Sequence, residues 1–327
     1  MVRKISDAIR RVLGIQGLKA EQIHIEKILR QYQRDQHSLH YETRRNYLAD
    51  HILNNKTPGV SSERYAPHDI IVSLTTYGRR IYDVALTIES IMQQSMKVNR
   101  IVLWLDDSFK GNHLPTALTS QMERGLEIAY CKDIRSYTKL IPSLKSFPDD
   151  AIITVDDDAL YDPYLLCNLI SAYQENSNCI HCCRAHRMLF DADGKLKPYN
   201  QWESCVKEAG INKHLFFTGV GGVLYPPHSL DEAIFDEEAF LDICPDADDV
   251  WFNAMAILRG TTINRVFTPS GKDPYLINEA VQDIALSIKN VGEGGNDRQI
   301  QAVFSKYGLF TKLKTVSSIK KCNFWRK

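Results

Sequence analysis

Residues 151–158 read Ala151-Ile152-Ile153-Thr154-Val155-Asp156-Asp157-Asp158, and this stretch decides the fold. Its first five residues are uncharged and mostly β-branched, which predicts a buried strand. A buried strand that ends in three carboxylates is costly, because like charges repel and desolvated carboxylates need a positive partner. In an open α/β sheet the carboxyl ends of the strands face the ligand crevice. The stretch therefore indicates a functional site as well as a strand.

A divalent cation would supply the positive charge that the aspartates need. Carboxylate oxygens suit Mg²⁺ or Mn²⁺, and such an ion usually keeps coordination positions free for phosphate oxygens. Alternate residues of an extended segment face the same way, so Asp156 and Asp158 are the expected metal ligands. We expect Asp157, between them, to contribute to binding the cofactor or donor. The alternative left open is a solvated acidic turn that leads into the next helix.

Strand-like and helix-like segments alternate along the middle of the chain. Expected strands cover residues 70–74, 101–105, 126–130 and 151–155, and expected helices cover residues 81–94, 137–147 and 163–173. This alternation predicts an α/β fold with a mainly parallel central sheet flanked by helices. We expect three parts: a helical N-terminal extension over residues 1–65, a main domain over 66–311 and a basic C-terminal tail over 312–327.

The composition excludes some classes of partner. The chain has 327 residues with 40 basic and 40 acidic side chains, a neutral balance that gives no sign of a nucleic-acid partner. No apolar run approaches the length of a membrane span, and residues 1–7 lack the apolar core of a signal peptide. We therefore expect a cytoplasmic protein.

The eight cysteines have no framework spacing, so reduced thiols are expected. Three of them, with two histidines, lie between residues 179 and 186. A zinc site is conceivable there, but the two Cys-x₂-Cys knuckles that usually pair at such a site are absent. Because free cysteine commonly behaves as a small buried hydrophobe, this segment is interpreted as a core strand.

The expected tail, residues 312–327, carries six lysines or arginines together with Phe324 and Trp325. A basic and aromatic tail fits peripheral contact with the anionic cytoplasmic face of the inner membrane. A frayed basic terminus is the alternative.

Polar residues follow the first expected strand at the same edge of the sheet. They are Thr75, Tyr77, Arg79 and Arg80. A guanidinium presents paired donors and stacks on rings, so the two arginines are candidates to clamp the base or pyrophosphate of a nucleotide. Lys139, just before the aspartate strand, is a candidate to reach a phosphate. Solvated loop residues are the alternative.

Residues 217–225 place three glycines in a strand-like setting. Glycine permits the backbone to approach a ligand closely, which makes Gly221 and Gly222 candidates for an acceptor site. A tight turn without a ligand is the alternative. Further along, Asp248 and Asp249 precede a helical pattern. They are either ordinary helix caps or carboxylates presented into a cleft.

Residues 290–297 form a glycine-rich segment that ends in Asn296 and Asp297 at the start of a helical pattern. Backbone N–H groups at such a position can cradle an anion, and glycine hinges permit closure over a diphosphate. A static helix cap is the alternative.

Taken together, these residues resemble the GT-A class of nucleotide-sugar-dependent glycosyltransferases, in particular family-2-like bacterial enzymes. The resemblance covers roughly residues 68–305. Residues 70–76 look like the nucleotide-binding first strand, and residues 156–158 look like the metal-binding DxD motif. Residues 219–225 look like the acceptor-side glycine loop, and residues 248–249 look like the acidic pair that supplies the catalytic base. The chain departs from the family in beginning that pair with aspartate and in lacking a QxxRW-type motif, which argues against a processive synthase.

The resemblance implies a reaction. A nucleoside diphosphate sugar would bind with its pyrophosphate on Mn²⁺ or Mg²⁺ at Asp158, with Asp156 assisting or holding the ribose. Asp249 would take the proton from an acceptor hydroxyl, with Asp248 as the second candidate, and the transfer would invert the sugar. The implied acceptor is a glycan or lipid-linked glycan of bacterial surface polysaccharide synthesis.

Two other classes of function stay open at this point. A metal-dependent nucleotidyltransferase or sugar-phosphate transferase also uses clustered carboxylates, although a glycine-rich phosphate signature near the first strand would be expected of it. A non-catalytic glycan-binding protein on the same fold is the second class, and the intact Asp156, Asp158 and Asp249 argue against it.

Overall fold

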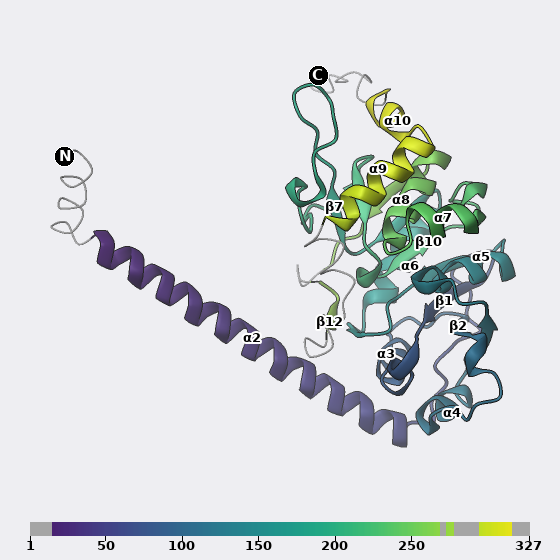
Figure 1. Cartoon of the computed structure of the whole chain (residues 1–327). Coiled ribbons are helices and arrows are strands. Elements are labelled where there is room, and N and C mark those ends of the chain that lie inside the picture. The colour runs from purple at the N-terminus through teal and green to yellow at the C-terminus, as the bar shows by residue number, and fades with distance from the viewer. Residues whose placement is uncertain (1–14, 269–272, 278–293, 316–327) are drawn as a thin grey trace, which may run out of the picture. The chain divides into compact units, whose positions relative to one another are not determined.

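The structure is a computed structural model that describes residues 15–268, 273–277 and 294–315 (Figure 1). The chain divides into two compact units, residues 1–47 and 48–327. The described part of the first unit belongs to one long helix, α2 (Ile15–Asn54), which continues into the second unit. Several of its apolar side chains are exposed, among them Ile23, Ile28 and Tyr32. The predicted boundaries at residues 65 and 311 stay predictions.

The second unit is built on an eight-stranded sheet with the order β3-β2-β1-β4-β10-β6-β11-β8. In that order the strands are Leu126–Cys131, Arg100–Asp106, Ile70–Thr75, Ala151–Thr154, Val223–Tyr225, Cys179–Cys182, Thr262–Arg265 and Gly210–Ile211. The β1–β2, β1–β4, β2–β3 and β6–β11 pairs are parallel, whereas β10 runs antiparallel to β4 and β6, and β8 antiparallel to β11. This topology confirms the expected α/β class with a mainly parallel sheet.

Helices cover both faces of the sheet, because alternate residues of each strand point to opposite sides. Ile71 belongs to one buried cluster and Val72 to the other. One cluster also receives residues from α3 (Val84–Met92), α4 (Thr116–Met122) and α6 (Leu165–Glu175). The other receives residues from α5 (Ile141–Ser146), α7 (Glu237–Ile243), α8 (Asp248–Arg259), α9 (Gly295–Lys306) and α10 (Leu309–Thr315). Two small sheets pair β5 (Ala159–Tyr161) with β12 (Tyr275–Ile277) and β7 (Ala185–Arg187) with β9 (Leu215–Phe217).

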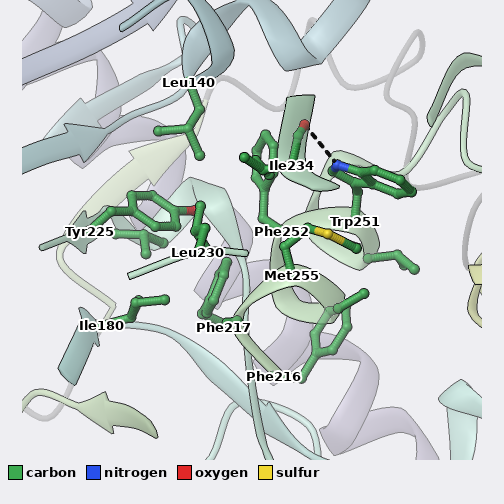
Figure 2. Packing of buried hydrophobic residues seen from close by; sticks show 14 of the residues in the cluster. Leu140, Ile180, Phe216, Phe217, Tyr225, Leu230, Ile234, Trp251, Phe252 and Met255 are labelled. Carbon is green, nitrogen blue, oxygen red and sulfur yellow. Dashed lines mark hydrogen bonds between the residues drawn. The ribbon is translucent and has the colours of Figure 1, made fainter. Parts of the chain in front are cut away.

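Aromatic packing fixes the first turn of α8 (Figure 2). The Trp251 indole N–H donates to the carbonyl oxygen of Ile234 over 3.3 Å, and the Phe252 ring meets Tyr137 edge-on with 5.6 Å between centroids. Both α8 side chains are fully buried. Since a buried aromatic side chain anchors its backbone strongly, the two aspartates that begin α8 are held in one place.

Two predicted helices are each divided in the structure. Residues 81–94 form a 3₁₀ turn, Gly78–Tyr82, followed by α3, and residues 137–147 form a 3₁₀ turn, Arg135–Lys139, followed by α5. In the second case Leu140 adopts φ −123°, outside the helical range, and Pro142 stands in the first turn of α5, where proline is accepted. The interruption leaves Lys139 at the end of the 3₁₀ turn.

The cysteine-rich segment forms the core strand β6, as predicted, with Cys179 and Cys182 both buried. Among the described residues, no group of three or more His, Cys, Asp or Glu side chains is placed to hold a metal ion. In the same part of the chain no helix has both the length and the apolarity needed to cross a membrane.

Candidate active site

The three aspartates form a tight turn between β4 and β5, at the carboxyl edge of the parallel strands. The Asp156 backbone N–H donates to the Tyr161 hydroxyl oxygen over 2.9 Å, and that hydroxyl donates to the Val220 carbonyl over 3.2 Å. The Thr87 hydroxyl lies 2.9 Å from the Asp157 carbonyl oxygen. The turn is therefore held by one side chain from the following strand, β5, and one from α3.

Arg80 reaches into the aspartate turn from the chain that follows β1. Its guanidinium lies 2.6 Å from the Asp157 carboxylate and 3.2 Å from that of Asp158. Thr76 adds a hydroxyl that donates to the second oxygen of Asp157 over 2.6 Å. Asp157 is thereby engaged through both oxygens, whereas Arg80 engages one oxygen of Asp158.

Lys139 is the second cation of the site and connects two groups of carboxylates. Its ammonium lies 2.8 Å from Asp156 and 2.9 Å from Asp248, and its side chain is only 8% exposed. Burial lowers the pKa of Lys139, but Asp156, Asp248 and Asp249 together raise it well above its ordinary value. The ammonium is therefore charged, and it joins the aspartate turn to the start of α8.

Asp249 stands beside this ammonium at the first turn of α8. One carboxylate oxygen of Asp249 accepts the Gly219 backbone N–H over 3.0 Å. Burial and the neighbouring Asp248 raise the pKa of Asp249 to about 7, against the lowering effect of Lys139. A carboxylate with a pKa near neutrality is suited to exchange a proton with a substrate.

Three of these groups pack directly against the backbone of Gly219. A Cβ atom placed there would lie 2.7 Å from the Lys139 ammonium, 3.2 Å from the Asp249 carboxylate and 3.4 Å from that of Asp156. The glycine thus allows the ends of all three side chains to meet at one point of the loop, because a larger residue would collide with the ammonium.

Gly221 and Gly222, the candidates for acceptor binding, lie in the same loop and also pack against protein atoms. A Cβ atom at Gly221 would come within 2.9 Å of the Arg184 backbone nitrogen, and one at Gly222 within 3.1 Å of Leu165. Gly222 also has φ +80°, which favours glycine. Packing and backbone conformation account for both glycines, and an acceptor role stays a prediction.

The other residues predicted after β1 are distributed differently. The Thr75 hydroxyl donates to the Trp104 carbonyl over 2.9 Å, so its hydrogen bond serves the sheet. Tyr77 and Arg79 are exposed, and the Tyr77 ring lies 5.2 Å from the Arg80 guanidinium carbon. Arg80 is thus the member of this group that the fold brings to the aspartates.

Asn296 and Asp297 lie in the first turn of α9, which begins at Gly295. Asn296 is buried, and the Asp297 carboxylate accepts the Tyr199 backbone N–H over 2.7 Å. Asp297 also lines a cavity of about 520 Å³ walled by Phe190, Trp202 and Phe310. Residues 290–293 of the predicted glycine-rich loop and residues 316–327 of the predicted tail lie outside the described residues.

The carboxylates of the turn fit a divalent ion. Burial, together with Asp156, raises the pKa of Asp158 to about 6, which records crowded negative charge that a cation would relieve. Asp156 and Asp158 offer hard oxygen ligands on one turn. Two carboxylates are a usual protein contribution to a Mg²⁺ site that binds phosphate oxygens as well.

Sequence reasoning assigned no individual role to Tyr161, Thr76 or Arg184. Tyr161 ties the aspartate turn to the glycine loop, and Thr76 holds Asp157. Arg184 donates to the Thr218 hydroxyl over 2.6 Å, one residue before Gly219. No sequence signal marks Arg184, whereas Thr76 belongs to the segment 70–76 that resembles a nucleotide-binding strand and Tyr161 follows closely after the three aspartates.

Comparisons with known proteins find solved structures of similar fold, among them the three that follow. The TM-score to S. aureus TarS 1-349 is 0.43, with 15% identity over 77% of this chain and 76% of that one. The inositol-1-phosphate CTP transferase from T. maritima gives 0.36, with 11% identity over 76% and 97% of the two chains. HddC from Yersinia pseudotuberculosis gives 0.32, with 12% identity over 49% and 78%. A scan against protein-family models and a search of curated proteins find no match. Because these TM-scores are below 0.5, the functional argument rests on the side chains described above.

Proposed function

We propose that this protein is a metal-dependent glycosyltransferase that moves a sugar from a nucleoside diphosphate sugar to a hydroxyl group of a glycan acceptor. The observation that carries the proposal is the placement of the Asp156–Asp158 turn beside Lys139 and Asp249, where these groups meet the backbone of Gly219. Five carboxylates meet two cationic side chains here, and a diphosphate with its metal ion complements such a site.

Asp156 and Asp158 would hold Mn²⁺ or Mg²⁺. When bound, the ion would neutralise the charge that builds on the leaving diphosphate. Arg80 keeps the turn in shape by pairing with Asp157 and Asp158, and the Lys139 ammonium holds the Asp156 side chain toward the site. These contacts orient the donor-binding groups before the donor arrives.

Asp249 is the proposed general base. Its carboxylate takes the proton of the acceptor hydroxyl while that oxygen forms a bond to the anomeric carbon and the bond from this carbon to the diphosphate breaks. A single displacement of this kind inverts the sugar. Asp248 is less suited to the role, because it is ion-paired with Lys139 at 2.9 Å, whereas the Asp249 pKa is raised toward neutrality. The proposed acceptor is a glycan or lipid-linked glycan of bacterial surface polysaccharide synthesis.

The proposal is tested by Asp158→Asn, which removes a charge and keeps the side-chain size. Thermal-shift titrations with UDP-, GDP- and CMP-sugars, each with and without Mn²⁺, measure donor binding. We expect one donor to stabilise the wild type in a Mn²⁺-dependent manner and the variant to lose that dependence. The matched control is Asp149→Asn, since Asp149 is an exposed aspartate paired with His228.

Two outcomes would contradict the proposal. Unchanged Mn²⁺-stimulated donor binding in Asp158→Asn would remove the metal assignment. Release of inorganic pyrophosphate from a nucleoside triphosphate, without release of a nucleoside diphosphate from a nucleotide sugar, would instead identify a nucleotidyltransferase.

A further inference from the structure

Arg184 is a half-buried cation beside the candidate active site that the proposed mechanism does not use. It lies between β6 and β7, and its carbonyl oxygen accepts the Thr218 backbone N–H over 3.2 Å. Its guanidinium donates to the Thr218 hydroxyl over 2.6 Å. Arg184 is thus attached to the glycine loop through both its backbone and its side chain.

This attachment places the guanidinium on the loop that contacts the proposed base. Thr218 is followed directly by Gly219, whose N–H donates to Asp249 over 3.0 Å. The acceptor hydroxyl must reach Asp249. Arg184 therefore borders the acceptor side of the site, whereas Arg80 occupies the aspartate turn, where the donor diphosphate is expected.

Two tyrosines share the electrostatic environment of Arg184. Burial raises the pKa of Tyr199, Asp249 raises it further, and Arg184 lowers it. Burial also raises the pKa of Tyr275, which Arg184 lowers and Asp156 raises. The guanidinium thus acts on two phenols that the carboxylates of the site also affect. Tyrosine rings and hydroxyl groups can contact the faces and hydroxyls of a sugar.

Arg184 makes no ion pair with a carboxylate in the described part of the chain, although, against the lowering effect of burial, Asp273 acts on it electrostatically and raises its pKa. Its Nε atom is buried and has no hydrogen-bond partner among those residues. Arg187, three residues later, also has a buried Nε without a partner, but its charge is paired with Glu203 at 2.8 Å and with Glu208 at 2.7 Å. A buried guanidinium N–H without an acceptor is costly, and an anionic oxygen from a ligand would satisfy it.

We propose that Arg184, flanked by Tyr199 and Tyr275, binds an anionic group on the acceptor, so that the preferred acceptor is a sugar carrying a phosphate or a carboxylate. This inference rests on the proposed transferase function and specifies its substrate class. Arg184 is a specificity residue in this reading, because it contacts the acceptor and takes no part in the proton transfer.

The first experiment measures anion binding without relying on transfer. Phenylglyoxal modifies accessible guanidinium groups, and peptide mass spectrometry gives the rate for each arginine. Glucose 6-phosphate and glucuronate should slow the modification of Arg184 at concentrations where methyl glucoside does not. Arg187, already paired with two glutamates, serves as the internal control and should be unaffected. Protection by only one anion would distinguish a phosphate site from a carboxylate site.

The second experiment compares acceptors in the transfer reaction, with the nucleotide sugar that thermal shift selects. Acceptors are p-nitrophenyl glycosides, their 6-phosphates and the matching glucuronide. We expect the wild type to prefer an anionic acceptor, and Arg184→Met to reduce that preference about 10- to 100-fold, the scale of a hydrogen bond to a charged group. Arg184→Lys should keep part of the preference and Arg187→Met all of it.

Each contrary result has a distinct meaning. Equal protection by methyl glucoside, or an equal loss of rate with neutral and anionic acceptors in Arg184→Met, would overturn the inference. A loss of nucleotide-sugar affinity in that variant would assign Arg184 to the donor instead. Absence of any Mn²⁺-dependent donor binding in the wild type would refute the proposed function, while the phenylglyoxal result would still report on the anion site.

Discussion

Two buried ion clusters of the second unit differ in how their charges balance. Arg124 grips Glu89 with two nitrogens at 2.7 and 3.1 Å, and its Nε donates to the Thr57 carbonyl over 2.9 Å. Gln121 adds a donor to Glu89 at 3.1 Å, and the Arg124 and Glu89 side chains are 3% and 0% exposed. Here one cation meets one anion.

The cluster around Lys139 has the opposite character. One ammonium contacts Asp156 and Asp248 and also acts on Asp249, and the backbone of Gly219 packs directly against it. Burying excess like charge raises free energy, so a fold retains such an arrangement where a ligand completes it. Both clusters are buried, so they differ mainly in the balance of positive and negative charge.

The largest expected effect is on catalysis at the unbalanced cluster. Asp249→Asn removes the proposed base and keeps its size, so we expect transfer to fall about 10²-fold or more. Donor binding, measured by thermal shift, should change little. A collapse of donor affinity together with the rate would identify Asp249 as a binding or structural residue. A larger rate loss in Asp248→Asn would exchange the roles of the two neighbours.

A change in the balanced Arg124–Glu89 cluster should lower the stability of the protein. Arg124→Met leaves Glu89 buried without its cation, so we expect a loss of roughly 3–5 kcal/mol in the free energy of unfolding. For a unit of this size the loss corresponds to a fall in Tm of roughly 6–20 °C by calorimetry. The rate per folded molecule should stay unchanged at low temperature.

Lys139→Met is the matched change in the unbalanced cluster. Without the ammonium the carboxylates repel each other when ionised, so the pKa of Asp249, already raised to about 7, should rise further. The loss of stability should then grow as the pH rises from 5 to 8, because the folded state resists ionisation. A pH-independent loss equal to that of Arg124→Met would erase the distinction between the clusters.

The raised pKa of Asp249 predicts a pH dependence of transfer. A general base acts when deprotonated, and the pKa of Asp249 is raised to about 7 by burial and by Asp248. The rate should therefore increase about tenfold per unit below that pKa and level off above it. Rates measured at saturating donor between pH 5.5 and 8.5 test this expectation, and a rate that falls through pH 7 would contradict it.

The smallest effects should come from adding single methyl groups to the glycine loop. At Gly219 the new carbon meets the flexible end of Lys139, so stability should change by less than about 1 kcal/mol while the rate falls a few-fold. At Gly221 it meets the Arg184 backbone, which cannot move aside, and about 1–3 kcal/mol should be lost. Chemical denaturation and initial rates for the two alanine variants distinguish function from packing.

The sequence predicted the parts of this structure that depend on local pattern. The strand before the aspartates and the mainly parallel sheet are present as expected. The entry of Arg80 among the aspartates was not predicted, since it depends on β1 lying beside β4 and joins residues 77 apart in sequence. From sequence, a metal ion was the only positive charge proposed to neutralise the aspartates. In the structure Arg80 and Lys139 supply positive charge to them.

A contact between residues far apart in sequence also limited the prediction for Asp297. Asp297 was expected to bind the donor from the start of α9, whereas its carboxylate accepts the backbone N–H of Tyr199, 98 residues away. An aspartate at the start of a helix has the same sequence pattern whether its carboxylate binds the backbone of a distant loop or faces a ligand. Only the folded chain separates these two uses, and the donor role of Asp297 stays a prediction.

The reversed strand β10 has a consequence for how this site can diversify. Because β10 runs against β4, with Val223 opposite Thr154, the loop that enters β10 lies at the same edge as the turn that leaves β4. Backbone pairing fixes this meeting point whatever side chains the strands carry. Mutations that lengthen or replace the chain between β6 and β10 can therefore change what this edge of the sheet binds while the aspartate turn is inherited intact.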